Sequence, residues 1–470
     1  MLSLTKTVRC MSALSPGLHI LTPGTDLAAL SKAGAQDVLP EGLRTARPCG
    51  FAELGNGVKV VTEPSLSPLA TVTLTVETGS RWDDLKRAGI GYMFAKLSTL
   101  RTDGSAAARL EALGAQLSVQ HTRETTQFLI QVPRESLEKA FPLLTALVLP
   151  GAKFTQGTVE TLRNSLVEAA SRPTDPQEML LDAIHASAFR SHPLGNPLKG
   201  TRKTLHSLTA VDIARYIETY IVGSRLVVSS TGAVSHDVMT SMCKETLNAL
   251  KRTNTDLSAA DPPTFVGSQT FVKNTEMDRV YAGVFFKAPA IGDSDYSIFE
   301  VLKTLLSPGQ DRHTPLAGVN FLQKWLGDIE DVIGHEVVCR AYREVGLFGH
   351  VVSCWDLGAH MAPIAAIKAC VAAAAEASEA DLSRARNQLY RRLLASTDTS
   401  RSAELGTQAL YWGRVLSQAE SAARAELVDR QALERACHRW FRSCEVAVAF
   451  LGPAFPERDY ALYRSLTAVK

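Results

Sequence analysis

The sequence predicts an α+β fold made of two similar halves of about 200 residues each. Stretches with the two-residue alternation of strands are interspersed with stretches of helical periodicity along the whole chain. The order of these elements also restarts roughly 210 residues after its first appearance, which indicates an internal duplication. With 470 residues, 45% of them hydrophobic, the chain can bury the large cores that such a fold needs.

The first half begins at Asn56-Gly57, a tight-turn signal that precedes the strand-like segment Val58–Glu63. From Ala70 to Val76, apolar residues alternate with threonines, a pattern that predicts a half-buried strand. A helix is expected at Ala88–Leu100. The remaining elements, in order, are a helix capped by Ser105 and ended by Gly114, β-structure over Gln116–Val132, helices near Leu137–Leu147 and Thr158–Ala170, a helix with Thr209 and Asp212 as its capping box, and a strand at Arg225–Ser230.

Residues 251 to 268, which include Asp261-Pro262-Pro263, are expected to form a linker. The second half repeats the opening pattern of the first and then continues with long helices. Its expected elements are strands at Phe271–Asn274 and Val280–Lys287, a helix at Tyr296–Leu306, an alanine-rich helix at Ile364–Ala377 with more helix to Leu394, and a last strand at Val446–Leu451. The expected division is therefore residues 1–50 as an N-terminal arm, 51–250 as the first domain, 251–268 as the linker and 269–470 as the second domain.

The N-terminal segment has the composition of a mitochondrial transit peptide. No acidic residue precedes Asp26, and Lys6 and Arg9 lie among Leu, Ser, Thr and Met. This pattern predicts a mitochondrial protein, with cleavage expected shortly after Arg9.

Composition excludes several classes of function. Fifty basic against 48 acidic residues give a net charge of +2, without the basic stripe of a nucleic-acid-binding protein. No apolar run approaches the roughly 18–20 residues that span a bilayer. The eight cysteines are scattered and form no C-x-x-C pair, so we expect free thiols in a reducing compartment rather than disulfides or a zinc knuckle.

General catalytic motifs are missing as well. The sequence contains no Walker loop, no Rossmann glycine fingerprint and no G-x-S-x-G elbow. No two histidines have the i, i+4 spacing that places two imidazoles on one helical face. His185, and the pair His335-Glu336, are therefore interpreted as structural residues rather than metal ligands.

One stretch resembles a known family. Gly79-Ser80-Arg81-Trp82-Asp83, then Gly89 and the helix from Tyr92, resemble the segment of the mitochondrial processing peptidase family that carries the inverted zinc motif H-x-x-E-H. Further matches keep the family's order: Leu110–Ala115, Thr122–Thr126, Ile184–Phe189, Leu194–Gly200 and Glu344–Gly349. The resemblance covers residues 50–460. It implies two homologous pitrilysin-like domains, each a mostly antiparallel sheet packed with helices.

The sequence departs from the family at the zinc motif itself. Its five positions read Tyr92, Met93, Phe94, Ala95 and Lys96, so both histidines and the general base are absent. The third-ligand position falls on Glu168, which the resemblance alone identifies, while its usual acidic neighbour is Thr161. One carboxylate cannot replace three protein ligands. We therefore expect no bound zinc, no catalytic residue and no cofactor, with Glu168 as an ordinary polar helix residue.

Two kinds of non-catalytic subunit in this family resemble a chain without the zinc ligands. One is core protein 2 of the cytochrome bc complex, respiratory complex III. The other is the α-subunit of the processing peptidase, which binds presequences with a glycine-rich loop. Here the corresponding segment, Leu306–Gly318, has two glycines and two prolines, so it lacks the backbone freedom of such a loop. The core protein is favoured, and the presequence-binding subunit remains the alternative.

The resemblance also implies the surroundings of the chain. A core protein would pair with a second core protein and contact cytochrome b, cytochrome c1, the Rieske iron-sulfur protein and small complex III subunits. It would lie on the matrix side of the mitochondrial inner membrane, peripheral to it, as a structural part of an oxidoreductase. No nucleic acid is expected as a partner.

Overall fold

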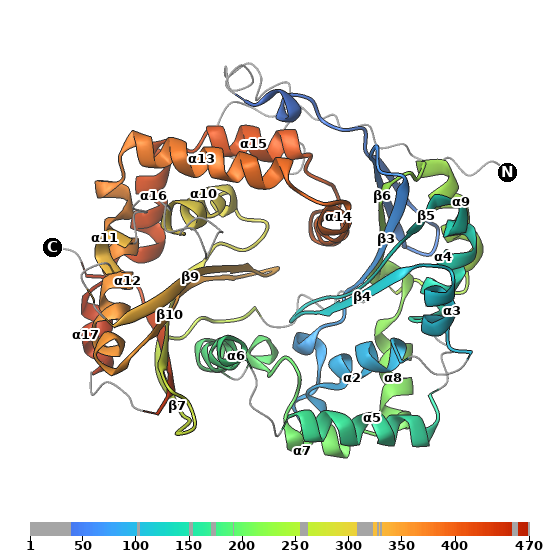
Figure 1. Cartoon of the computed structure of the whole chain (residues 1–470), viewed down its shortest axis with the longest axis horizontal. Coiled ribbons are helices and arrows are strands. Elements are labelled where there is room, and N and C mark those ends of the chain that lie inside the picture. The colour runs from blue at the N-terminus through green and yellow to red at the C-terminus, as the bar shows by residue number, and fades with distance from the viewer. Residues whose placement is uncertain are drawn as a thin grey trace.

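The computed structural model describes residues 39–100, 104–149, 154–170, 175–190, 192–253, 262–307, 323–326, 329, 331–453 and 459–468. They form two sheets, each with its own set of helices, which lie beside each other (Figure 1). This confirms the predicted α+β class. The transit-peptide segment and most of the loop Leu306–Gly318 lie outside the described residues.

The first sheet has the strand order β1-β2-β6-β3-β5-β4. Its strands are β1 (Gly50–Glu53), β2 (Lys59–Pro64), β3 (Leu69–Val76), β4 (Gln116–His121), β5 (Thr126–Pro133) and β6 (Leu226–Gly232). Only β2 and β6 pair in parallel, and every other neighbouring pair is antiparallel.

The second sheet repeats this topology in the order β7-β11-β8-β10-β9. Its strands are β7 (Ser268–Lys273), β8 (Val280–Ala288), β9 (Val332–Ala341), β10 (Gly346–Cys354) and β11 (Val446–Gly452). The order corresponds strand for strand to β2-β6-β3-β5-β4, and its single parallel pair, β7 with β11, corresponds to β2 with β6. The shared topology confirms the predicted duplication.

Helices pack around both sheets. In the first half they are α2 (Ile90–Ser98), α3 (Ala106–Ala112), α4 (Leu137–Ala146), α5 (Gln156–Ala169), α6 (Pro176–Ala188), α7 (Arg202–Ser207), α8 (Ala210–Tyr220) and α9 (His236–Thr246). In the second they are α10 (Tyr296–Leu306), α11 (Gln323–Leu326), α12 (Asp356–Glu376), α13 (Glu379–Leu394), α14 (Asp398–Trp412), α15 (Gln418–Glu426), α16 (Arg430–Phe441) and α17 (Tyr460–Ser465).

Local signals in the sequence explain several helix ends. Ser105 accepts a hydrogen bond from the backbone N–H of Ala108, and Gly114 adopts a positive φ of 73° just after the helix. Thr209 and Asp212 form the predicted capping box. The alanine-rich helix, however, begins at Asp356 rather than Ile364, because the chain tolerates Pro363 inside the helix.

Strand β3 differs from the prediction in its burial. It was expected to be half-buried, but both its apolar face and its threonine face are inaccessible to solvent. The apolar face packs in the core of the first half, and helix α14 of the second half covers the other face. The alternation was detected correctly, but the covering helix comes from more than 300 residues further along the chain.

Helix α6 does the reverse of α14: it comes from the first half and covers the sheet of the second half. It belongs to the first half by sequence, yet it packs on β7, β8 and β11 of the second sheet (Figure 1). Leu180 and Ile184 on this helix join a buried cluster with Phe285 and Leu347 of the second sheet. Each half therefore supplies a helix that covers the sheet of the other.

Among the described residues, no single helix is long and apolar enough to cross a membrane. The helix pair Met361–Glu376 and Glu379–Leu394 meets the length and composition criteria jointly, with a bend of 108° between the two.

Candidate functional site

Helix α2 carries the positions of the zinc motif, and its start is tightly determined. Gly89 precedes the helix with a φ of 93°, and a Cβ there would lie 2.8 Å from the Cα of Gly200. The Asp83 carboxylate accepts hydrogen bonds from the backbone N–H of Gly89 at 2.8 Å and of Gly91 at 3.4 Å. These contacts fix the start of the helix relative to Asp83 and Gly200.

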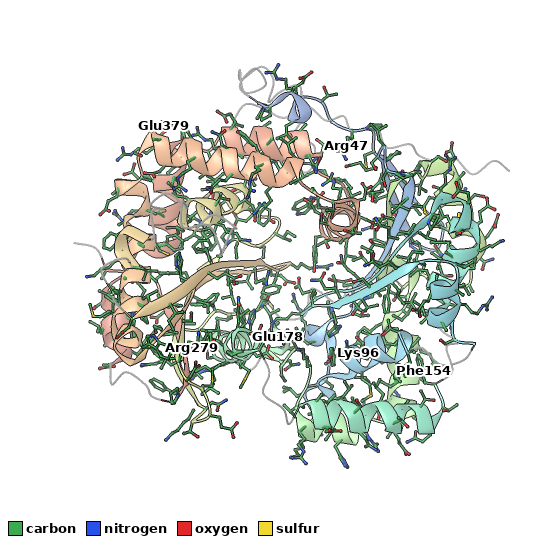
Figure 2. All side chains as sticks on the ribbon, in the orientation of Figure 1. Arg47, Lys96, Phe154, Glu178, Arg279 and Glu379 are labelled. Atoms are coloured by element: carbon green, nitrogen blue, oxygen red, sulfur yellow. The ribbon has the colours of Figure 1, made fainter. Side chains whose placement is uncertain are left out.

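The side chains presented by α2 are not zinc ligands. Tyr92 and Lys96 lie one helical turn apart, with the Lys96 Nζ 5.5 Å from the centroid of the Tyr92 ring. Lys96, which is labelled on this helix in Figure 2, is exposed, whereas Ala95 is buried. A protonated ammonium has no lone pair to donate to a metal, and Ala95 cannot polarise a water molecule.

Glu168 lies on α5, a helix that packs against α2. The fold therefore brings the expected third-ligand position to the same side of the first half as the motif positions. Glu168 is exposed. Within the described ranges, no group of three or more His, Cys, Asp or Glu side chains could hold a metal ion. The residues at this site do not fit zinc, and no step of a zinc-peptidase reaction can be assigned to them.

A buried polar cluster behind α2 was missed by sequence reasoning. The His121 Nδ1 lies 2.8 Å from the Thr126 Oγ1, and the Thr126 hydroxyl donates to the Thr78 carbonyl. Burial lowers the pKa of His121 to about 3, and burial raises the pKa of Asp83 to about 7. His121 is therefore neutral near pH 7. The sequence did contain a signal that His121 is buried. His121 follows Leu117 and Val119 at two-residue spacing, which places all three on one face of β4.

Of the two histidines interpreted as structural, His185 lies where the exchanged helix α6 meets the second sheet, and His335 lies on strand β9. Buried His185 has its Nε2 2.6 Å from the Tyr342 Oη and its Nδ1 2.6 Å from the Leu181 carbonyl. Next to His335 on β9, Glu336 accepts a hydrogen bond from the Gln177 Nε2 at 2.7 Å. These contacts agree with a structural role, because they join the two halves.

A second network of charged residues also links the halves. Arg81 is buried between Glu124 and Glu344, at 2.5 Å from a carboxylate oxygen of each. The Tyr411 hydroxyl of α14 donates to Glu124 at 2.7 Å. Burial raises the pKa of Glu124, against the opposing effect of the Arg81 charge. The family-like stretches around Gly79–Asp83, Thr122–Thr126 and Glu344–Gly349 thus meet in a structural junction.

Buried polar contacts continue along α14. The Arg401 Nη2 lies 2.6 Å from a carboxylate oxygen of Glu63, and both side chains are only 2% exposed. The Ser402 hydroxyl lies 2.8 Å from the Thr73 hydroxyl, and Gln127 donates to the Ala403 carbonyl at 2.9 Å. The threonine face of the first sheet is therefore matched by a polar helix face.

The chain has two duplicated α+β domains, and the zinc-motif positions on α2 carry no zinc ligands. These features define its class: a peptidase fold without a zinc site of the family's type. Comparison with known proteins identifies the family. The chain belongs to the insulinase family of peptidases, M16: residues 59–202 match the insulinase family model, and residues 207–389 match the model described as the peptidase M16 inactive domain.

Similar proteins of this family come from mitochondria. A probable mitochondrial-processing peptidase subunit beta from Arabidopsis thaliana is 29% identical over 432 residues, covering 88% of this chain and 80% of the relative. Cytochrome b-c1 complex subunit 1 from Rattus norvegicus is 24% identical over 428 residues, covering 88% of both proteins. The finer resemblance to the second core protein stays a prediction.

A solved structure shares the fold. One chain of complex III2 from Candida albicans superimposes with a TM-score of 0.75 at 18% sequence identity, covering 89% of this chain and 99% of that one. The chain therefore has the fold of a complex III component, and its relatives include both complex III subunits and processing-peptidase subunits.

Proposed function

We propose that this chain is a non-catalytic core subunit of mitochondrial respiratory complex III, ubiquinol–cytochrome c reductase. The observation that carries the proposal is the pairing of Lys96 with Tyr92, next to a buried Ala95, on the helix that holds the family's zinc motif. An intact fold with these residues supports a structural role, because zinc-dependent hydrolysis needs three protein ligands and a base.

The construction of the chain also supports a structural role. The exchanged helices α6 and α14 join the halves, and the buried pair Arg401–Glu63 connects α14 to strand β2 of the first sheet. We propose the domain division 51–250, 251–268 and 269–470, because each of the two larger ranges contains one sheet apart from a single residue at its start, Gly50 of β1 and Ser268 of β7. A subunit that supports a larger assembly benefits from such a rigid frame.

The proposed location is the matrix side of the mitochondrial inner membrane, peripheral to the bilayer. The proposed partners are a second core protein of the same family, cytochrome b, cytochrome c1, the Rieske iron-sulfur protein and small complex III subunits. The rat relative, named as a cytochrome b-c1 complex subunit, supports this assignment.

A second candidate is an α-like, presequence-binding subunit of the mitochondrial processing peptidase. The Arabidopsis relative favours it, because that protein is named as a subunit of this enzyme. Such a subunit would bind a basic presequence and leave hydrolysis to a partner with an intact zinc motif. The glycine-rich loop of such a subunit would correspond to Leu306–Gly318 of this chain. Two prolines in this segment reduce its backbone freedom, which counts against this candidate.

Zinc content and cleavage test the non-catalytic part of the proposal. We expect the purified full-length chain to hold fewer than about 0.1 zinc ions per molecule and to leave a fluorescent presequence peptide uncut. A processing-peptidase subunit with an intact H-x-x-E-H motif is the positive control. Stoichiometric zinc together with chelator-sensitive cleavage would contradict the proposal.

Presequence binding separates the two candidates. The chain is titrated to about 100 μM against a labelled basic presequence peptide, a concentration well above the dissociation constant of a specific peptide complex. We expect no saturable change in the fluorescence anisotropy of the peptide. Saturable binding that weakens with salt, without cleavage, would favour the processing-peptidase candidate instead.

A further inference from the structure

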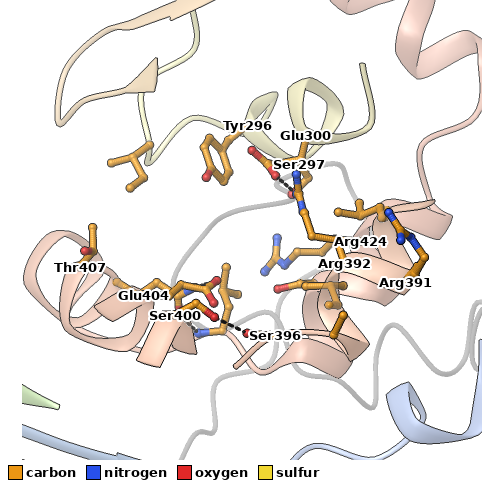
Figure 3. A pocket seen from close by; sticks show the side chains of 18 of the residues that line it. Tyr296, Ser297, Glu300, Arg391, Arg392, Ser396, Ser400, Glu404, Thr407 and Arg424 are labelled. Carbon is orange, nitrogen blue, oxygen red and sulfur yellow. Dashed lines mark hydrogen bonds and ion pairs between the residues drawn. The ribbon is translucent and has the colours of Figure 1, made fainter. Parts of the chain in front are cut away.

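A cavity of about 570 Å³ lies in the second half, away from the zinc-motif helix, among α10, α13, α14 and α15 (Figure 3). This volume falls within the usual range for small-molecule sites. Part of its wall is apolar, with Leu389, Leu393 and Trp412 as contributors. The rest is strongly polar, so the cavity combines the two kinds of surface that bind an organic ion.

Three arginines line the cavity against two glutamates, and both glutamates already have partners. Glu300 forms an ion pair with Arg392. Glu404 accepts hydrogen bonds from the Arg401 Nη1 at 3.0 Å and from the Gln408 Nε2 at 2.8 Å. Both glutamates of the wall are therefore engaged by other residues, so Arg391 and the Nη1 atom of Arg424 remain as donors for a ligand.

Arg424 is the most informative of these residues. Its side chain is only 1% exposed, and its Nε and Nη2 both donate to Glu420, which is also paired with Arg414 at 2.8 Å. One carboxylate thus serves two guanidinium groups. The Arg424 Nη1 is buried without a hydrogen-bond partner among the described residues. Burial lowers the pKa of Arg424, as expected for an incompletely compensated cation. Buried polar groups normally have partners, so this nitrogen indicates a missing acceptor.

The N-terminus of α14 lies at the same cavity. Thr397 caps this 15-residue helix, and Thr397, Ser396 and Ser400 all line the cavity wall. The first backbone N–H groups of a helix and its dipole favour a bound anion. Figure 3 shows Ser400 and Glu404 on the opposite side of the space from Arg392 and Arg424. Polar side chains from three different helices, α13, α14 and α15, therefore surround one space.

We propose that this cavity binds a small molecule that carries a phosphate group. The phosphate oxygens would accept from Arg424 and Arg391, near the N-terminus of α14, while the apolar part of the molecule would pack on Leu389 and Trp412. Phosphate suits this site better than a carboxylate does, because its oxygens can satisfy several donors arriving from different directions. The molecule could be a free phosphate ester, such as a nucleotide, or a lipid headgroup with its chains, and the experiment distinguishes these sources.

Isothermal titration calorimetry on the full-length chain tests the proposal. The probes are ADP, a short-chain phosphatidate below its micellar concentration, and inorganic phosphate. We expect ADP or the phosphatidate to bind with a dissociation constant below about 1 mM, and inorganic phosphate to bind more weakly because it lacks the apolar part. Tighter binding of ADP assigns the site to a soluble ester, and tighter binding of phosphatidate assigns it to a lipid.

Two variants and a control complete the test. Arg424→Gln and Arg391→Gln are each expected to weaken binding at least about tenfold. Arg391 is exposed, whereas Arg424 is buried in an ion pair with Glu420, so Arg391→Gln carries the test if Arg424→Gln does not fold. Arg215→Gln, at an exposed arginine of α8 in the first half, removes the same charge and should leave binding unchanged. Absence of binding by all three probes, or binding that Arg391→Gln and Arg424→Gln leave intact, would overturn the proposal.

Discussion

Lys96 and Ala95 lie on a helix whose start is held by Asp83, Gly89 and Gly91. The supporting contacts of the motif helix are present even though the reactive side chains differ from those of the family motif. The Asp83 carboxylate holds the backbone N–H groups of Gly89 and Gly91, so the start of the helix does not depend on what Tyr92 and Lys96 offer to a metal. This separation explains how the motif helix can keep its structure when the residues of the zinc motif differ.

Much of this site could be predicted from the sequence, because the motif positions are local. Tyr92, Ala95 and Lys96 lie within one helical segment, and their spacing alone places them on adjacent turns. The junction of Arg81, Glu124 and Glu344 could not be predicted, because its members are up to 263 residues apart. Pairing over such separations depends on how the two halves pack, and a single sequence carries no local signal for it.

The buried pair Arg401–Glu63 should be important for stability. Arg401→Met leaves the Glu63 carboxylate buried and without its cation, so we expect the free energy of unfolding to fall by about 3–5 kcal/mol. Arg252→Met is the matched control, because Arg252 and its partner Glu53 are about half exposed, at 53% and 45%. The control should cost no more than about 1 kcal/mol. Urea unfolding measures both; equal losses in the two variants would contradict this assignment.

His121 should make the protein sensitive to acid. Its pKa is about 3 in the folded chain, whereas an unfolded histidine titrates near 6.5. Between these values an unfolded His121 binds a proton that the folded one does not, so the His121 contribution to stability falls with pH from about 6.5, by up to about 1.4 kcal/mol per pH unit, while Asp83, with its pKa raised to about 7, acts in the opposite direction. His121→Asn should therefore flatten the decline measured by urea unfolding between pH 6.5 and pH 5. Parallel declines in the variant and the original chain would show that His121 is protonated in the fold.

Helices α6 and α14 are the elements on which the arrangement of the two halves depends. Helix α14 follows the predicted helices of the second half, and its polar surface gives no indication that it will be buried against another sheet. The threonine face of β3 was accordingly predicted to be exposed. Helix α6, in contrast, presents apolar residues such as Leu180 and Ile184, and its burial against an apolar sheet follows the ordinary hydrophobic pattern.

Gly406 should be the position at which α14 is most sensitive to substitution. A Cβ there would lie 2.2 Å from the Thr75 Oγ1 and 3.0 Å from the Ser229 Oγ, so Gly406→Ala must displace the helix from the sheet. We expect a loss of about 1–3 kcal/mol in thermal or urea unfolding.

Gly157→Ala is the control for this prediction. Gly157 is also helical, but a Cβ there meets nothing within 4 Å. The substitution should be neutral or stabilising by up to about 1 kcal/mol, because alanine restricts the unfolded chain more than glycine does. A Gly406→Ala variant as stable as Gly157→Ala would show that α14 does not pack closely on the first sheet.

At the scale of the whole molecule, the duplication and the exchange of helices produce one frame from two similar halves. The duplication was visible in the sequence, because strands and helices recur in the same order. The exchange was not, because it depends on contacts between elements of different halves. A frame joined at both sheets by buried side chains suits a subunit that supports other proteins.

The central claim is tested most directly by the partners of the chain. The tagged full-length protein is isolated from its own mitochondria in mild detergent, and the copurifying proteins are quantified by mass spectrometry. The account predicts cytochrome b, cytochrome c1, the Rieske protein and a second core protein in amounts nearly equal to the chain. A soluble heterodimer with an H-x-x-E-H subunit, free of cytochromes, would contradict it and assign the chain to the processing peptidase.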